Sequence, residues 1–183
     1  LENSIATALV LAVLIAVFLG LSGAQFNPAV TLAIAVLDRR TARPGTVLGY
    51  LAAQVLGAVG GAAPPPERAL DLGDGDALRL RRPRQRRPDR RPQAALQRES
   101  PGTLLGEVVA TAGLVLVIVV LVRAGRERAL PLAVAGWIGA AYWFTSSTSF
   151  ANPAVTLART ITDTFAGIAP ASAGWFILAQ LVG

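Results

Sequence analysis

Long apolar runs separated by short polar segments dominate this chain of 183 residues. Four runs, each of 16 to 19 residues with at most one formal charge, cover residues 5–21, 47–63, 104–122 and 129–144. A helix needs about 20 apolar residues to cross the ~30 Å hydrocarbon core of a bilayer, so the pattern predicts four membrane-spanning helices. A fifth run, 171–183, would reach only about 20 Å at ~1.5 Å per residue, and we expect that the chain stops inside a helix.

A seven-residue motif, NPAVTLA, occurs twice, at residues 27–33 and 152–158, each time shortly after an apolar run. Asn is a favoured N-cap and Pro is favoured at the first helical position, so each copy predicts a helix start. Helices of about ten residues from Pro28 and Pro153 would each cover ~15 Å, half of the hydrocarbon core. Irregular backbone at that depth is tolerated only where it is buried or lines a watery cavity. The motifs therefore predict two half-helices that line one pore; the alternative is that both Asn residues act only as caps.

Arginines in the short loops indicate how the chain crosses the membrane. One group precedes the second apolar run and another follows the third, so two spans separate the groups and they share a side. The positive-inside rule makes that side cytoplasmic, and the two motifs then enter the membrane from opposite faces. The groups are Arg39, Arg40 and Arg43, and Arg123, Arg126 and Arg128.

The order of elements also repeats. LAAQVLG at residues 51–57 follows the first motif and LAQLVG at residues 178–183 follows the second, a match that chance similarity between apolar helices also explains. Because the two copies enter from opposite faces, the arrangement is an inverted repeat. Residues 1–63 form the first predicted pseudo-repeat and residues 101–183 the second.

Residues 64–100 between the repeats have a different composition. They hold ten of the 17 arginines and six of the 11 acidic residues, and without them the net charge is +2 instead of +6. So basic a loop on the outer side conflicts with the positive-inside rule, and it has no aromatic residue that could order it. We expect a disordered loop, which a shifted reading frame in GC-rich DNA would explain; a polybasic arm for anionic lipid or RNA is the alternative.

The chain contains no Cys, Met, His or Lys. This excludes disulfides, thiolate chemistry, histidine metal sites, histidine general bases and lysine Schiff bases. We therefore expect no enzymatic activity, no cofactor and no bound metal. Nucleic-acid binding is not expected either, because the basic residues outside the 64–100 segment are few.

Two NPA boxes on re-entrant half-helices resemble the aquaporin, or major intrinsic protein, family, and the similarity covers residues 1–63 and 101–183. The resemblance implies an all-α membrane protein, an inverted-repeat bundle of six spans around two half-helices, of which the first span and part of the sixth are missing here. It also implies a passive channel for small uncharged solutes. The expected partner of this channel is the lipid bilayer. The channel is expected to assemble as a homotetramer and to be a multi-pass protein of the bacterial plasma membrane.

The resemblance also assigns roles to residues. The amides of the two motif Asn residues would donate hydrogen bonds to a passing solute, and the positive ends of the half-helix dipoles would repel cations. Glu107 resembles a buried carboxylate that holds the re-entrant backbone, and Arg159, one turn beyond Val155, would lie nearer the outer vestibule. The pore motifs are Asn27, Pro28, Ala29, Asn152, Pro153 and Ala154, and the selectivity filter, placed by its spacing from them, is Thr7, Ala140, Ser149 and Val155.

Four small filter side chains predict a wide and weakly polar constriction. Most family members place Arg where this chain has Val155 and a bulky aromatic residue where it has Thr7. Larger uncharged solutes therefore become candidates, among them glycerol-like polyols, urea and ammonia beside water. Two segments of the chain are similar to bacterial channels associated with arsenic resistance, namely LENSIAT and YWFTSSTSFANPAVTLARTITDTFAGIAPAS. This similarity implies neutral trivalent or methylated arsenic species as further solutes.

Two other functions stay open from the sequence. A secondary transporter also uses broken helices at inverted repeats, but it needs ionisable groups near the midplane, where Glu107 is the one candidate. The second is a non-conducting product: a chain that lacks the first span and part of the sixth and carries a scrambled loop would not assemble a sealed pore. A solute-flux measurement in liposomes separates both from a working channel.

Overall fold

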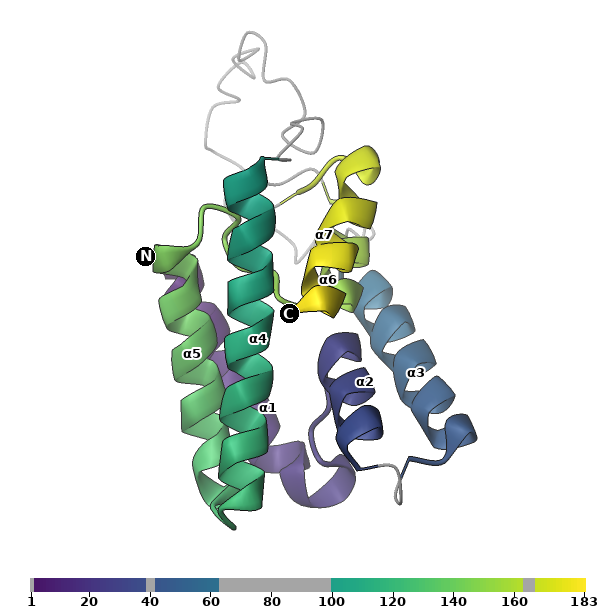
Figure 1. The fold of residues 1–183 in the computed structure, drawn as a ribbon, viewed down its shortest axis with the longest axis vertical. Helices are drawn as coiled ribbons and strands as arrows, with labels where there is room; N and C mark the ends of the chain where they lie inside the picture. The colour runs from purple at the N-terminus through teal and green to yellow at the C-terminus, as the bar shows by residue number, and fades with distance from the viewer. Residues whose placement is uncertain (1, 39–41, 63–99, 163–166) are drawn as a thin grey trace, which may run out of the picture.

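The computed structural model is helical in all its regular elements (Figure 1). It describes residues 2–38, 42–62, 100–162 and 167–183. The disorder and the shifted reading frame predicted for residues 64–100 therefore fall outside the described part, except at Ser100. Ser100 caps the helix that follows: its hydroxyl accepts a bond from the Thr103 N–H (3.1 Å), and Thr103 Oγ1 accepts one from the Ser100 N–H (2.9 Å). This reciprocal pair is a capping box.

Three of the four predicted spans are confirmed as helices long and apolar enough to cross a membrane. They are α1 (Glu2–Ser22), α3 (Pro44–Ala62) and α4 (Pro101–Arg123).

The fourth predicted span is a shorter helix. α5 (Leu130–Phe144) has 15 residues, which cover about 22 Å. The single 3-10 turn before it, η2 (Glu127–Ala129), adds about 6 Å, so the two together reach close to the length of a span. The fifth run forms α7 (Pro170–Val182), with 13 residues.

The half-helices begin at the predicted prolines, because each is preceded by an Asn that caps it. α2 (Pro28–Leu37) has ten residues, as predicted. α6 (Pro153–Arg159) has seven, so the predicted length of about ten was wrong. Thr160, Ile161 and Thr162 follow it, and β-branched residues are weak helix formers. The Thr160 hydroxyl also donates to the Leu157 carbonyl (2.6 Å), which ends the helix in a tight turn.

The helices are arranged so that the half-helices meet inside the bundle (Figure 1). α1 packs along α5, α4 packs against α5 and α7, and α3 packs against α2 and α6. α2 runs from the middle toward the lower end of the view, whereas α6 runs toward the upper end, where the Ile168 N–H bonds the Arg159 carbonyl (3.2 Å) before α7 begins. The half-helices therefore point in opposite directions, as the inverted repeat requires.

The ends that carry the short-loop arginines also lie together. The end of α2, the start of α3, the end of α4 and the start of α5 are all at the lower end of Figure 1. Arg43 and Arg123 belong to these ends, which agrees with the predicted common side. Which side of a membrane this is stays a prediction.

The buried core lies between α1, α4 and α5. Ile15, Leu114, Val134 and Ile138 form its centre together with Val30 of α2. By contrast, none of the described residues of α3 is buried, and large apolar side chains on the outer faces of α1 and α4 are also exposed. An apolar exterior of this kind suits helices that are surrounded by lipid.

α4 and α5 approach closely at Gly113. The indole ring of Trp137 lies where a Cβ of residue 113 would be, and its Nε1–H donates to the Ala110 carbonyl (2.8 Å). Trp137 also makes an edge contact with Phe144, with ring centroids 5.5 Å apart. The indole ring of Trp137 is therefore one of the contacts that hold α5 against α4.

Gly113→Ala should destabilise the bundle, because the new methyl group displaces the indole ring and breaks its hydrogen bond. We expect a loss of about 1–3 kcal/mol, the usual effect of overpacking. Denaturant unfolding in detergent, followed by tryptophan fluorescence, measures it. The control is Gly136→Ala on α5, where a Cβ meets no atom within 4 Å and the higher helix propensity of Ala should be neutral or stabilising. Equal stability of the two variants would contradict the packing role of Gly113.

Candidate functional site: a cavity between two half-helices

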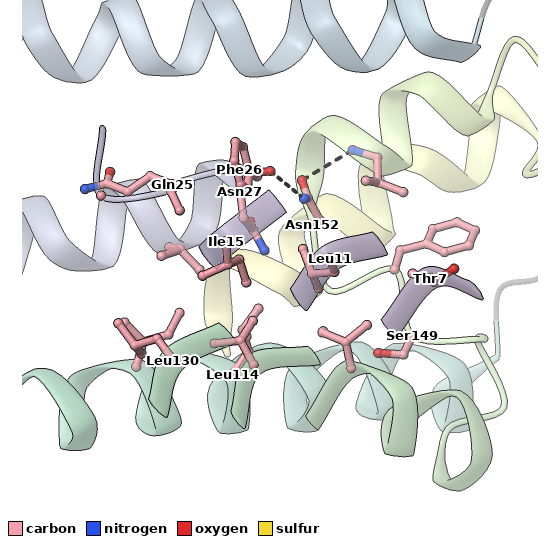
Figure 2. Close-up of a pocket in the computed structure, with 18 of the residues that line it drawn as sticks. Thr7, Leu11, Ile15, Gln25, Phe26, Asn27, Leu114, Leu130, Ser149 and Asn152 are labelled. Carbon is pink, nitrogen blue, oxygen red and sulfur yellow. Dashed lines mark hydrogen bonds between the residues drawn. The ribbon is translucent and has the colours of Figure 1, made fainter. Parts of the chain in front are cut away.

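A cavity of about 240 Å³ lies between the two half-helices and helices α1, α4 and α5. Thr7 and Ser149 lie at one end of it, Gln25 and Leu130 at the other, and Asn152 between them (Figure 2). Its apolar wall comes from two rows of side chains, each on one helix face because residues four apart are neighbours. The rows are Thr7, Leu11, Ile15 and Leu19 on α1, and Leu130, Val134, Ile138 and Tyr142 on α5.

Both half-helices present equivalent positions to the cavity. Asn27 and Val30 belong to the first copy of the motif, and Asn152 and Val155 to the second. One turn further on, the repeats differ: the first copy places Ile34 against the cavity and the second places Arg159 there. The two ends of the cavity therefore differ in charge although the motif itself is identical.

The two motif Asn residues connect the halves of the molecule. Asn27 Nδ2 donates to the Ala151 carbonyl (2.6 Å), and Asn152 Nδ2 donates to the Phe26 carbonyl (2.9 Å) (Figure 2). An amide has two N–H donors, so each Asn keeps one that no described residue uses.

The same Asn residues cap their helices. Asn27 Oδ1 accepts from the Ala29 N–H, and Asn152 Oδ1 accepts from the N–H groups of Ala154 and Val155, at 3.0 to 3.3 Å. Capping is thus present in the structure, and it leaves the remaining amide donors available. The role of these donors in the pore stays a prediction.

The loop before α6 is held by one carboxylate. Glu107 of α4 is fully buried, and its Oε1 accepts from Ser147 Oγ (2.5 Å) and the Phe150 N–H (2.9 Å). Its Oε2 accepts from the Ala151 N–H (2.8 Å) and from Gln180 Nε2 of α7 (2.6 Å). Glu107 therefore bonds four donors from the loop and from α7.

This loop needs such support because its backbone is strained. Thr148, Ser149 and Ala151 have φ values of 65°, 47° and 44°, a region that residues with a Cβ rarely adopt. Each such residue costs about 1–3 kcal/mol and persists only where its surroundings enforce the conformation. The bonds to Glu107 supply that enforcement.

A Gln–Thr pair recurs in both repeats. Gln180 Nε2 also donates to Thr156 Oγ1 of α6 (2.9 Å), and Gln54 Nε2 of α3 donates in the same way to Thr31 Oγ1 of α2 (2.8 Å). Gln54 Nε2 contacts the Gln25 carbonyl as well. The similarity between the Ala-Gln segments, which chance could explain in the sequence, therefore corresponds to matching contacts in the structure.

The structure brings three of the four predicted filter residues to the cavity. Thr7, Ser149 and Val155 line it, with Arg159 near by, whereas Ala140 is exposed on the outside of α5. Ala140 follows the lining residue Ile138 by two positions, which is about 200° around the helix.

Tyr142, which the sequence analysis missed, lines the cavity instead of Ala140. Its OH lies 3.4 Å from Thr7 Oγ1 of α1. The signal that could have found it is the row of residues four apart on α5, from Leu130 to Tyr142.

The comparisons with known proteins agree with this architecture. The family model of the major intrinsic protein matches residues 1–148. The chain belongs to the major intrinsic protein family. It is also 40% identical, over 189 aligned positions, to the aquaglyceroporin AqpS of Rhizobium meliloti (strain 1021), and the match covers 99% of this chain and 69% of that protein. No solved structure matches the chain.

Family membership establishes the general class of the molecule. The resemblance inferred from the two NPA boxes is confirmed, and so is the all-α, aquaporin-like membrane fold. The chain is a membrane channel protein for small solutes and not an enzyme.

Glu107→Gln should destabilise the pore loop, because one carboxylate oxygen becomes an amide that donates instead of accepting. At least one of the four donors then loses its acceptor, and we expect a loss of at least about 2 kcal/mol, since hydrogen bonds to charged groups contribute ~1.5–3 kcal/mol. Denaturant unfolding in detergent measures the loss. Glu127→Gln, in the exposed turn before α5, is the matched control and should be neutral. An unfolding curve for Glu107→Gln that overlays the control would refute the role of the carboxylate.

Proposed function

We propose that this chain conducts small uncharged solutes passively through the cavity between its half-helices. The observation that carries the proposal is the meeting of the two helix N-termini at Asn27 and Asn152, each with one amide donor left over, inside an otherwise mostly apolar wall. Among the described lining residues, Arg159 is the one with a formal charge. An ion would have to leave its hydration shell for aliphatic side chains, which costs far more than the same transfer of an uncharged solute.

The alternative of a coupled secondary transporter finds less support. Coupling requires an ionisable group that the solute or ion pathway can reach. Glu107, the candidate from the sequence, does not line the cavity and has both carboxylate oxygens bonded to the loop and to α7. A carboxylate in that setting supports the backbone and is separated from the cavity.

The proposed solute class follows from the predicted filter residues that line the cavity. Val155 lacks the charge that the family resemblance leads one to expect there, and Thr7 is small, so glycerol-like polyols, water, urea and neutral arsenic species are the proposed solutes. AqpS bears the name of an aquaglyceroporin, which supports the polyols. We further propose a homotetramer in the bacterial plasma membrane, on the basis of the family resemblance and the bacterial relative.

Reconstitution into liposomes tests the function. Stopped-flow light scattering after a jump in glycerol or urea should show faster swelling than in protein-free liposomes, while a KCl gradient should produce no ionic current. Folded protein without any solute flux would favour the non-conducting alternative. Accumulation of solute against its gradient, driven by Na⁺ or H⁺, would favour the transporter.

Val155→Arg should narrow the cavity and reduce glycerol flux by at least about tenfold, which corresponds to ~1.4 kcal/mol of added barrier, while sparing water. The same stopped-flow assay, normalised to folded protein, measures both solutes. Val155→Leu is the control for added volume without charge. Equal loss of water and glycerol flux would count against the filter assignment, because it would indicate general damage.

A further inference from the structure

We propose that Tyr142 and Thr7 form a hydroxyl pair at one end of the cavity that selects for solutes rich in hydroxyl groups. The two residues are 135 positions apart in the sequence and come from different helices, α5 and α1, yet their oxygens lie 3.4 Å from each other. Both line the cavity. The proposal rests on the proposed function as a solute channel, and it assigns a specificity role to a residue outside the filter positions.

The position of the pair sets it apart from the rest of the wall. Thr7 and Tyr142 are the terminal members of the two rows on α1 and α5, and every other member of these rows is Leu, Ile or Val. A solute that moves along these helices therefore meets aliphatic side chains until it reaches the two hydroxyls.

Ser149 adds a third hydroxyl at the same end of the cavity (Figure 2). The residue is 3% exposed, and its Oγ has no hydrogen-bond partner among the described residues. Because this oxygen is itself buried, the hydroxyls that the proposal rests on are those of Thr7 and Tyr142.

The contact between Tyr142 and Thr7 is weak enough to be exchanged. Hydrogen bonds between hydroxyl oxygens usually measure 2.5–3.0 Å, and this pair is separated by 3.4 Å. Solute hydroxyls that approach the pair from the cavity can form one shorter bond to each of the two oxygens. A solute with fewer hydroxyls leaves one of them unpaired against an apolar wall, and its barrier is higher.

The tyrosine ring has a second effect, on size. The spacing from the second motif predicts the small side chain of Ala140 in the filter, which would leave a wide constriction. A phenol ring from Tyr142 fills part of that space, so the cavity is narrower than four small filter residues predict. Removing only the hydroxyl, and keeping the ring, separates selection by bonding from selection by size.

The test uses the full chain in liposomes and compares glycerol with 1,2-propanediol, which has the same carbon skeleton and one hydroxyl fewer. Tyr142→Phe and Thr7→Val should each lower the ratio of glycerol to propanediol flux by about two- to tenfold, the range that one neutral hydrogen bond provides. The double variant should lower it no further than either single variant, because the residues act as a pair. Fluxes are normalised to folded protein and corrected for protein-free liposomes.

Tyr50→Phe is the matched control, since it removes the hydroxyl of a tyrosine that lies outside the cavity and donates to the Ser22 carbonyl (2.6 Å). It should leave the flux ratio unchanged. If solute flux is present and the ratio of glycerol to propanediol flux is the same for Tyr142→Phe as for Tyr50→Phe, the Tyr142 proposal alone is overturned. Absence of any solute flux in the unchanged chain overturns both this proposal and the proposed function.

Discussion

Backbone that turns back inside a membrane must satisfy its own hydrogen bonds, because lipid offers no partners. Most features of this molecule follow from that requirement. The loop before α6 bonds its amides to Glu107, and the helix starts are capped by Asn27 and Asn152. The same two Asn residues bond the carbonyls of the opposite loop, so each half of the molecule completes the other. The meeting point of the two half-helices is thereby held by polar contacts within an apolar bundle.

A cavity becomes possible once those contacts are fixed. The rows on α1 and α5 contribute mostly aliphatic side chains, which neither bond the backbone nor attract ions. Among the described lining residues, the polar groups come from the loops, from the ends of the rows and from Arg159 of α6. The resulting cavity has a mostly aliphatic wall and a few polar positions, among them Asn152 and Tyr142.

The sequence predicted the elements well and the details of the site less well. Helix starts at Pro28 and Pro153 were correct because Asn-Pro is a strong local signal. The length of α6 was wrong, because the threonines after Arg159 bond backbone carbonyls and end the helix early. Ala140 was placed by its spacing from the second motif, but the rotation of α5 depends on packing.

Trp137 shows why such packing could not be predicted from the motif. Its ring lies against Gly113 of α4, in the rotation of α5 that brings Ile138 and Tyr142 to the cavity and leaves Ala140 exposed. Which glycine accepts which indole ring depends on how two helices approach, and no local pattern in either helix encodes that. Likewise, the repeated Ala-Gln segments could be explained only from the structure, in which Gln54 and Gln180 each donate a hydrogen bond to a threonine of a half-helix.

The bonding of Glu107 has a consequence in time as well as in space. Its partners in the loop come 40 to 44 residues later in the chain, and Gln180 comes 73 residues later. At a synthesis rate of about 5–20 residues per second, roughly 2–8 s pass between the synthesis of Glu107 and that of the first of these partners. A lone carboxylate is costly in a lipid environment during that interval. Insertion of α4 therefore has to supply other donors, such as water in the insertion channel, until the ribosome has delivered the loop that the carboxylate will hold.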